Sequence, residues 1–267
     1  MEDYAPPMPP RARRVAARLL PHGPVDLLRQ VLLFAGAYYV YRLTRGLADD
    51  PDAASTAFQH ARDLINIERG LNVFVEPSVQ AFVAGERWLA DVVSWLYINA
   101  QTSVTLGALV WIYMFRNSSF YFVRNMFLVA FGLALIGYAV FPTAPPRFLP
   151  EWGFIDTVSQ FTGIPQDSVT VDALFNPYAA VPSMHAGFAL MIGWPLARLV
   201  RPKILKVFWA SYPLLVTFVI VATANHFLAD AFLGAVTAGL GAIAAWWMAR
   251  VRPAAWSFGQ RAEATAT

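Results

Sequence analysis

Two histidines and an aspartate have the residue types and spacing that favour chemistry in this chain. The chain contains four histidines and no cysteine, so thiol nucleophiles and thiolate metal sites are excluded. His226 and Asp230 are four residues apart, which on a helix places both side chains on one face. A carboxylate beside an imidazole selects its tautomer and makes the far nitrogen more basic. His185 follows Pro182-Ser183-Met184 at the expected start of another helix, where free backbone N–H groups favour an anion.

Three interpretations of His185, His226 and Asp230 are open from the residues alone. They can be structural polar residues whose hydrogen bonds are satisfied within a helix bundle. They can form a reactive site, which is favoured because ionisable residues in a membrane are costly and often functional. They can also be metal ligands, although a His–Asp pair at this spacing is equally an orienting pair. Nothing in the sequence requires a metal, and we expect no cofactor.

Membrane helices are the elements that must position these residues. Of the 267 residues, 57% are hydrophobic and 14% are charged, whereas a soluble domain has about 25% charged residues. The mean hydropathy is +0.46. These values exclude a disordered chain and a disulfide-based scaffold, and they argue against a nucleic-acid-binding protein. The composition predicts an all-α membrane protein with a single helical domain.

Six segments have about the 20 apolar residues that a spanning helix needs. They cover approximately residues 25–47, 92–115, 120–141, 182–200, 204–222 and 226–248. We therefore expect a six-helix membrane catalytic domain over residues 25–250, preceded by a basic segment, 1–24, and followed by a tail, 251–267. Residues 1–24 are too charged and too rich in proline for a signal peptide, so the first helix is expected to remain as an anchor.

Two connections between these segments are long enough to hold structure of their own. The first contains an amphipathic run, residues 53–75, whose apolar residues recur near helical spacing. We expect this run to form a helix that lies along the membrane surface. The second connection, 143–181, is rich in proline and turn signals but also contains aromatic and aliphatic residues. This mixture predicts a packed, structured outer loop.

The charges predict how the bundle is oriented. Thirteen Lys and Arg residues, Arg116, Arg124 and Arg198 among them, fall on the side that holds both termini. The other side has four, Arg62, Arg69, Arg87 and Arg147. Cytoplasmic segments of membrane proteins carry the excess of positive charge. We therefore expect cytoplasmic termini, a plasma (inner) membrane location, and His185 and His226 together at the extracytoplasmic side.

Several short motifs lie around the two histidines. Residues 181–185, Val-Pro-Ser-Met-His, resemble the second signature of the type 2 phosphatidic acid phosphatase superfamily, in which Pro-Ser-x-His is diagnostic. Residues 225–230, Asn-His-Phe-Leu-Ala-Asp, resemble the third signature, and 141–147 occupy the place of the first. Asn-Pro-Tyr-Ala-Ala at 176–180 and the run from Glu68 to Glu76 are similar to the branch of fungal inositol phosphorylceramide synthases and their bacterial relatives. The similarity covers about residues 61–241.

The resemblance implies phosphoryl transfer in two in-line steps. His226, held by Asp230, attacks phosphorus and forms a phosphohistidine. His185 protonates the leaving oxygen and then activates the acceptor hydroxyl or water. The resemblance also assigns phosphate binding to Arg147, Ser183 and Asn225, and substrate binding to Asn176 and Tyr178. Arg147 is equally compatible with an ordinary interfacial anchor.

The sequence departs from the superfamily phosphatases in its cations. They usually carry a Ser-Arg pair before the third-signature histidine, where this chain has Val219 and Ile220. Fewer cations favour a phosphodiester donor, and so transfer of a phospho-head group of the inositol phosphate type from a phospholipid to a hydroxyl acceptor. The alternative is a lipid phosphate phosphatase acting on phosphatidate or a polyprenyl (pyro)phosphate. A lipid transporter without chemistry is disfavoured because the ionisable residues cluster at one end of the bundle.

Overall fold

The structure is a computed structural model, which describes residues 19–43, 51–164 and 176–256. Within these ranges it is helical and contains no strand; a single isolated bridge joins Thr143 to Ala179. Each of the six apolar segments contains a helix: α2 (Pro24–Leu43), α5 (Arg87–Phe115), α6 (Asn117–Val140), α9 (Met184–Leu199), α10 (Lys203–Ala222) and α11 (Leu228–Val251). The short α12 (Pro253–Trp256) follows. The all-α prediction is confirmed for the described residues.

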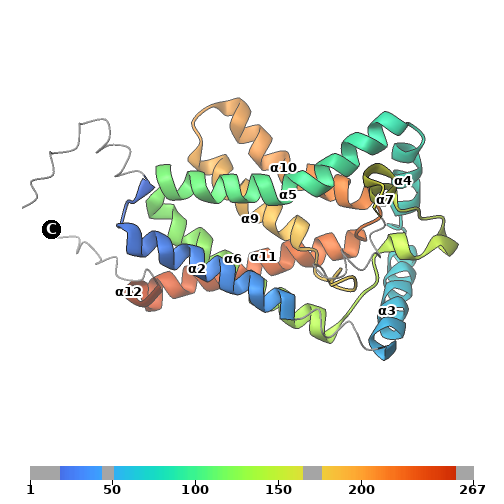
Figure 1. The fold of residues 1–267 in the computed structure, drawn as a ribbon, viewed down its shortest axis with the longest axis horizontal. Coiled ribbons are helices and arrows are strands. Elements are labelled where there is room, and N and C mark those ends of the chain that lie inside the picture. The colour runs from blue at the N-terminus through green and yellow to red at the C-terminus, as the bar shows by residue number, and fades with distance from the viewer. Residues whose placement is uncertain (1–18, 44–50, 165–175, 257–267) are drawn as a thin grey trace, which may run out of the picture.

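Three of these helices, α6, α10 and α11, are long and apolar enough to cross a membrane. The chain is therefore a membrane protein. Helices α2, α5, α6 and α11 run along the long axis of the molecule (Figure 1). Helix α11 packs against both α6 and α9, and α9 packs against α10.

The starts of α5 and α11 are among those that differ from the predictions by two residues or more. Helix α5 begins at Arg87 rather than near Val92. Helix α11 begins at Leu228, so His226 lies in the connection before it rather than on the helix. The reason is a local cap: Phe227 has extended backbone angles, and its N–H donates to Oδ2 of Asp230 at 2.9 Å. The predicted end of the first helix, near residue 47, lies outside the described residues.

The amphipathic run, 53–75, forms one helix that ends before the run does, and a second helix begins just after the run. Helix α3 (Pro51–Gly70) ends at a turn in which Asn72 has a φ of 58°, and α4 (Glu76–Ala84) follows. Asparagine tolerates this left-handed conformation better than most residues, so the chain can reverse here. Helix α3 lies across one end of the bundle (Figure 1). Its buried face, which includes Leu64 and Ile65, packs on Leu149 and Phe227.

The described part of the outer connection is packed rather than extended. It contains two short 3-10 helices, η2 (Pro146–Phe148) and η3 (Pro150–Trp152), and the helix α7 (Thr157–Thr162). Leu149 and Phe154, which belong to this connection, are buried. The side chain of Gln80 donates to the carbonyl of Ile155 at 2.7 Å and accepts its N–H at 3.1 Å, which joins this connection to α4.

A glycine lets α9 and α11 approach closely. A Cβ atom added to Gly234 of α11 would overlap the carbonyl oxygen of Ser183, at the start of α9. The same carbonyl accepts the N–H of Gly187, and the Ser183 N–H donates to the carbonyl of Asp230 at 3.0 Å. The helices that begin beside His185 and His226 are therefore held together by direct backbone contact.

A buried polar network occupies the opposite end of the bundle. Asp26 of α2 accepts hydrogen bonds from Tyr113 at 3.1 Å, Tyr121 at 2.9 Å and Gln30 at 2.9 Å. Arg124 of α6 has no exposed surface and donates to Oε1 of Gln30 at 3.1 Å. The charge count places Arg124 on the cytoplasmic side, and that placement stays a prediction; its side chain is buried inside the bundle. The guanidinium joins α6 to α2 inside the protein.

Candidate active site

His226 and Asp230 contact each other, although only Asp230 lies on α11. Nδ1 of His226 is 3.2 Å from Oδ2 of Asp230. Asp230 has no exposed surface, and 6% of His226 is exposed. The predicted pairing is present because the Phe227 cap folds the connection back over the first turn of α11. Burial, together with the nearby Arg147 guanidinium, lowers the pKa of His226, which lies outside both flanking helices. The imidazole is therefore neutral, as a nucleophile must be.

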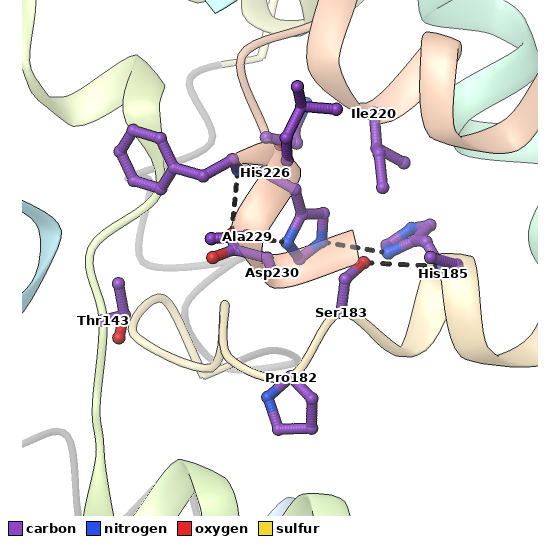
Figure 2. Close-up of polar contacts among 12 residues, drawn as sticks. Thr143, Pro182, Ser183, His185, Ile220, His226, Ala229 and Asp230 are labelled. Atoms are coloured by element: carbon purple, nitrogen blue, oxygen red, sulfur yellow. Dashed lines mark hydrogen bonds and ion pairs between the residues drawn. The ribbon is translucent and has the colours of Figure 1, made fainter. Parts of the chain in front are cut away.

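His185 meets His226 from the first turn of α9. Nδ1 of His185 is 3.3 Å from Nε2 of His226, and Figure 2 shows the His226 ring between Asp230 and His185. The ring of Tyr97, from α5, stacks on His185 with centroids 4.8 Å apart and an interplanar angle of 18°. The side chains of Asp230, His226, His185 and Tyr97 therefore form one row, in which each contacts the next. They come from the start of α11, from α9 and from α5, which are far apart in the sequence.

The hydrogen bonds assign the protons in this row. Oδ2 of Asp230 already accepts the Phe227 N–H, so it also acts as the acceptor toward His226. Nδ1 of His226 must then carry a proton, and its Nε2 presents a lone pair. His185 consequently donates through Nδ1. With these protons, the lone pair on Nε2 of His226 faces the Nδ1–H of His185.

Ser183 is buried at the start of α9. Its Oγ accepts the N–H of Ala186 at 3.5 Å, as an N-cap does (Figure 2). Its own N–H donates to the carbonyl of Asp230. These contacts give Ser183 a role in positioning α9 against α11. Its predicted contact with phosphate stays a prediction.

Arg147 and Asn225 come together beside His226. The backbone N–H of Arg147 donates to the carbonyl of Ala224 at 2.8 Å, and its Nη1 donates to Oδ1 of Asn225. Asn225 in turn donates to the carbonyl of Thr223 at 3.1 Å. Both the main chain and the side chain of Arg147 are thus fixed to the connection that carries His226. This arrangement favours a site residue over an interfacial anchor.

Asn176 and Tyr178 lie in the turn before α9. Oδ1 of Asn176 accepts the Tyr178 N–H at 2.9 Å, and the Tyr178 carbonyl accepts the N–H of Thr143 at 2.8 Å. The Tyr178 ring packs edge-on against Phe58 of α3. These contacts hold the turn in place, and the substrate contact predicted for both residues stays a prediction.

Three residues at the site were not assigned a role from the sequence. Tyr97 stacks on His185, and two buried glutamates, Glu68 and Glu76, accept the first N–H groups of α11. Glu68 carries a signal that was not used: it falls on the apolar face of α3, one helical turn after Leu64 and Ile65. A carboxylate on a buried face needs a partner.

The interpretation of His185, His226 and Asp230 as metal ligands can be compared with the geometry of the described residues. No group of three or more histidine, aspartate or glutamate side chains among the described residues is arranged to hold an ion. The side chains of His185, His226 and Asp230 contact one another in a row instead.

Comparison with known families identifies the family of the chain. A family model described as the PAP2 superfamily matches residues 62–244, which is more than half of the chain. The matched range contains Arg147, His185, His226 and Asp230, and it confirms the resemblance at the level of the superfamily. Comparison with curated proteins and with solved structures finds no match.

Proposed function

Since the chain belongs to the PAP2 superfamily, we propose that it cleaves a phosphate ester of a membrane lipid through a phosphohistidine. Membership supports an enzyme of the lipid phosphatase or phosphotransferase type. The observation that supports the specific mechanism is the row Asp230–His226–His185, in which a neutral nucleophile faces a proton donor.

The first step forms the covalent intermediate. Nε2 of His226 attacks phosphorus, the ester P–O bond breaks, and His185, in its imidazolium form, passes its Nδ1 proton to the leaving oxygen and becomes a neutral imidazole. Asp230 stabilises the positive charge that develops on the His226 ring. Arg147 stabilises the equatorial oxygens of the loose transition state.

The second step releases the phosphoryl group. His185, now lacking the proton, takes one from an acceptor hydroxyl or from water. The acceptor oxygen attacks phosphorus, the P–N bond breaks, and the electron pair returns to Nε2 of His226. Transfer and hydrolysis thus use the same residues and differ in the acceptor. We propose no metal or cofactor for either step.

Transfer of a phospho-head group of the inositol phosphate type is the preferred reaction. Arg147 is the only basic residue in the 143–181 connection, and Val219 and Ile220 are buried apolar residues of α10. A site with one such cation suits a phosphodiester better than a doubly charged phosphomonoester. The second candidate is a phosphatase acting on phosphatidate or a polyprenyl (pyro)phosphate. The same two histidines would serve this reaction, with water as the acceptor.

Six membrane spans are proposed, although three helices satisfy the length and hydropathy requirements by themselves. The positive-charge asymmetry supports cytoplasmic termini, an inner-membrane location and an extracytoplasmic site. Helix α3 crosses the end of the bundle, and we propose that it lies in the membrane interface (Figure 1).

The test is incubation of the purified protein with labelled phosphatidylinositol and a native lipid extract. A new labelled lipid indicates transfer, and free inositol phosphate alone indicates hydrolysis. His226→Ala should abolish either product and the acid-labile phosphohistidine, whereas His22→Ala, an exposed histidine at the other end of the bundle, should not. EDTA should leave the rate unchanged. Substantial turnover by folded His226→Ala would refute the mechanism.

A further inference from the structure

We propose that Glu68 and Glu76 form an acid pair that shares one proton and positions the start of α11 for catalysis. The pair acts through His226 and Asp230, so the inference rests on the proposed function. The two glutamates are positioning residues, because neither is placed against the reacting atoms.

Three carboxyl groups from three helices hold consecutive N–H groups at the start of α11. The N–H of Phe227 donates to Asp230 at 2.9 Å, that of Leu228 to Oε1 of Glu76 at 2.8 Å, and that of Ala229 to Oε1 of Glu68 at 2.7 Å. The first N–H groups of a helix have no partner within the helix. Here α3, α4 and α11 itself supply those partners. The start of α11 is therefore fixed in place by both α3 and α4.

The second oxygen of each glutamate indicates a shared proton. Glu68 is 2% exposed and Glu76 is fully buried, and Oε2 of each is buried without a hydrogen-bond donor in the described structure. Two adjacent carboxylates in such surroundings cannot both be ionised without a large cost. A proton on Glu68 that donates to Glu76 satisfies both oxygens.

The electrostatics agree with this geometry. Burial, the hydrogen bond with Glu76 and the charges of Glu76 on α4 and Asp230 on α11 raise the pKa of Glu68 from 4.5 to about 8, while the N–H of Ala229 lowers it. Glu68 is therefore protonated at neutral pH. The stabilisation from the protonated form is fully present below about pH 4.5 and is lost as the pH rises through about 8.

The consequence for catalysis follows from the position of His226. This residue directly precedes the three N–H groups, so a displacement of the first turn of α11 moves its Nε2 atom. A shift of about 1 Å in a reacting group can reduce a rate about a hundredfold. Ionisation of Glu68 places two negative charges side by side beneath this turn and should reduce the rate in the same way.

The kinetic test compares Glu68→Gln with Glu68→Ala. The amide of Gln can still donate to Glu76 and accept the Ala229 N–H, so Glu68→Gln should keep kcat near neutral pH and lose the fall in kcat near pH 8. Glu68→Ala should lower kcat about tenfold to a hundredfold with little change in KM. Glu86→Gln and Glu86→Ala, at an exposed glutamate before α5, are the matched controls. Equal loss in both Glu68 variants, or an unchanged fall near pH 8 in Glu68→Gln, would overturn the proposal.

A second measurement needs no substrate. Hydrogen exchange of the peptide containing residues 226–230 should be faster in Glu68→Ala than in wild type and unchanged in Glu68→Gln, at matched intrinsic exchange rates. If no ester is turned over, the proposed function fails, yet exchange still decides whether the acid pair exists. If His226→Ala abolishes turnover but Glu68→Ala changes neither kcat nor exchange, the acid pair alone is wrong.

Discussion

At the residue scale, the guanidinium of Arg147 is fixed beside the connection that carries His226, and the proposed mechanism needs a cation there. It follows Pro145-Pro146, its N–H binds Ala224, and its Nη1 binds Asn225. The Cζ atom also lies 4.7 Å from the centroid of the Phe148 ring. A planar guanidinium held in this way presents further N–H groups in a fixed direction, which an ammonium group cannot do.

Replacing Arg147 with Lys should therefore reduce kcat/KM on the order of tenfold or more, although the charge is kept. The measurement is the steady-state rate with the lipid donor identified by the labelling assay. Arg62→Lys is the matched control, because Arg62 makes a half-exposed ion pair with Glu151 at 3.7 Å. Full activity of Arg147→Lys combined with loss of activity in EDTA would favour the metal interpretation of the histidines.

Asp230→Asn should lower the rate of phosphohistidine formation on the order of a hundredfold. One atom, Oδ2 of Asp230, accepts both the Phe227 N–H and the Nδ1–H of His226, so an Asn oxygen in its place keeps both hydrogen bonds. The variant loses the negative charge that stabilises the positive charge developing on the His226 ring. Single-turnover trapping of the phosphoenzyme measures this step. Asp63→Asn, on the exposed side of α3, should react normally, and normal trapping in Asp230→Asn would contradict the role of the Asp230 charge.

Residue spacing predicted the His226–Asp230 pair, because four residues along the chain limit how far the two can separate. The pairing with His185 followed from placing both at the same membrane depth. Tyr97 and Glu76 could not be predicted in this way. Their contacts with His185 and Leu228 join residues far apart in the chain, and such contacts depend on how the helices pack.

At the element scale, the spacing between α9 and α11 depends on the absence of a side chain at Gly234. The backbone of Ser183 occupies the space that a Cβ atom would need. Since His185 and Asp230 lie within one turn of this contact, the separation of the two helices also sets the separation of the two imidazoles.

Gly234→Ala should destabilise the protein by about 1–3 kcal/mol and lower activity, because overpacking forces α9 and α11 apart. Thermal unfolding in detergent and the lipid assay measure the two effects. Gly239→Ala is the control on the same helix, since a Cβ atom there meets nothing within 4 Å. That variant should be neutral or more stable by up to about 1 kcal/mol. Equal behaviour of the two variants would show that the close contact is unimportant.

Element boundaries were predicted less well than element positions. The length of their apolar runs identified α6 and α10, because about 20 consecutive apolar residues predict a membrane helix regardless of its neighbours. The start of α11 was misplaced because the cap by Asp230, Glu76 and Glu68 draws on two other helices. The break between α3 and α4 depends on the backbone conformation of Asn72, and hydropathy does not report this.

At the scale of the whole molecule, the positive-charge asymmetry remains when Arg124 is removed from the count of cytoplasmic cations. Arg124 belongs to the buried network with Gln30, so it does not contribute to the cytoplasmic surface. Twelve of the thirteen counted cations still oppose four on the other side. The predicted orientation therefore does not depend on this residue.

The orientation can be tested with single cysteines, because the chain has none of its own. Glu86→Cys lies between α4 and α5 on the proposed outer side, and Ser118→Cys lies at the start of α6 on the proposed cytoplasmic side; both positions are exposed. A membrane-impermeant maleimide should label Glu86→Cys in intact spheroplasts and Ser118→Cys only after permeabilisation. The reverse pattern would place the active site in the cytoplasm.

The contact between the two imidazoles determines how a lipid chain contributes to the reaction. In-line transfer places phosphorus about 3 Å from Nε2 of His226 and the leaving oxygen about 3 Å from Nδ1 of His185. These nitrogens are 3.3 Å apart and must move to about 6 Å or more. The free energy for this separation must come from binding parts of the substrate remote from phosphorus. In the proposed mechanism, binding of the hydrocarbon tail supplies the free energy that separates the two imidazoles. A short water-soluble ester lacks this tail and should react slowly even at saturating concentration.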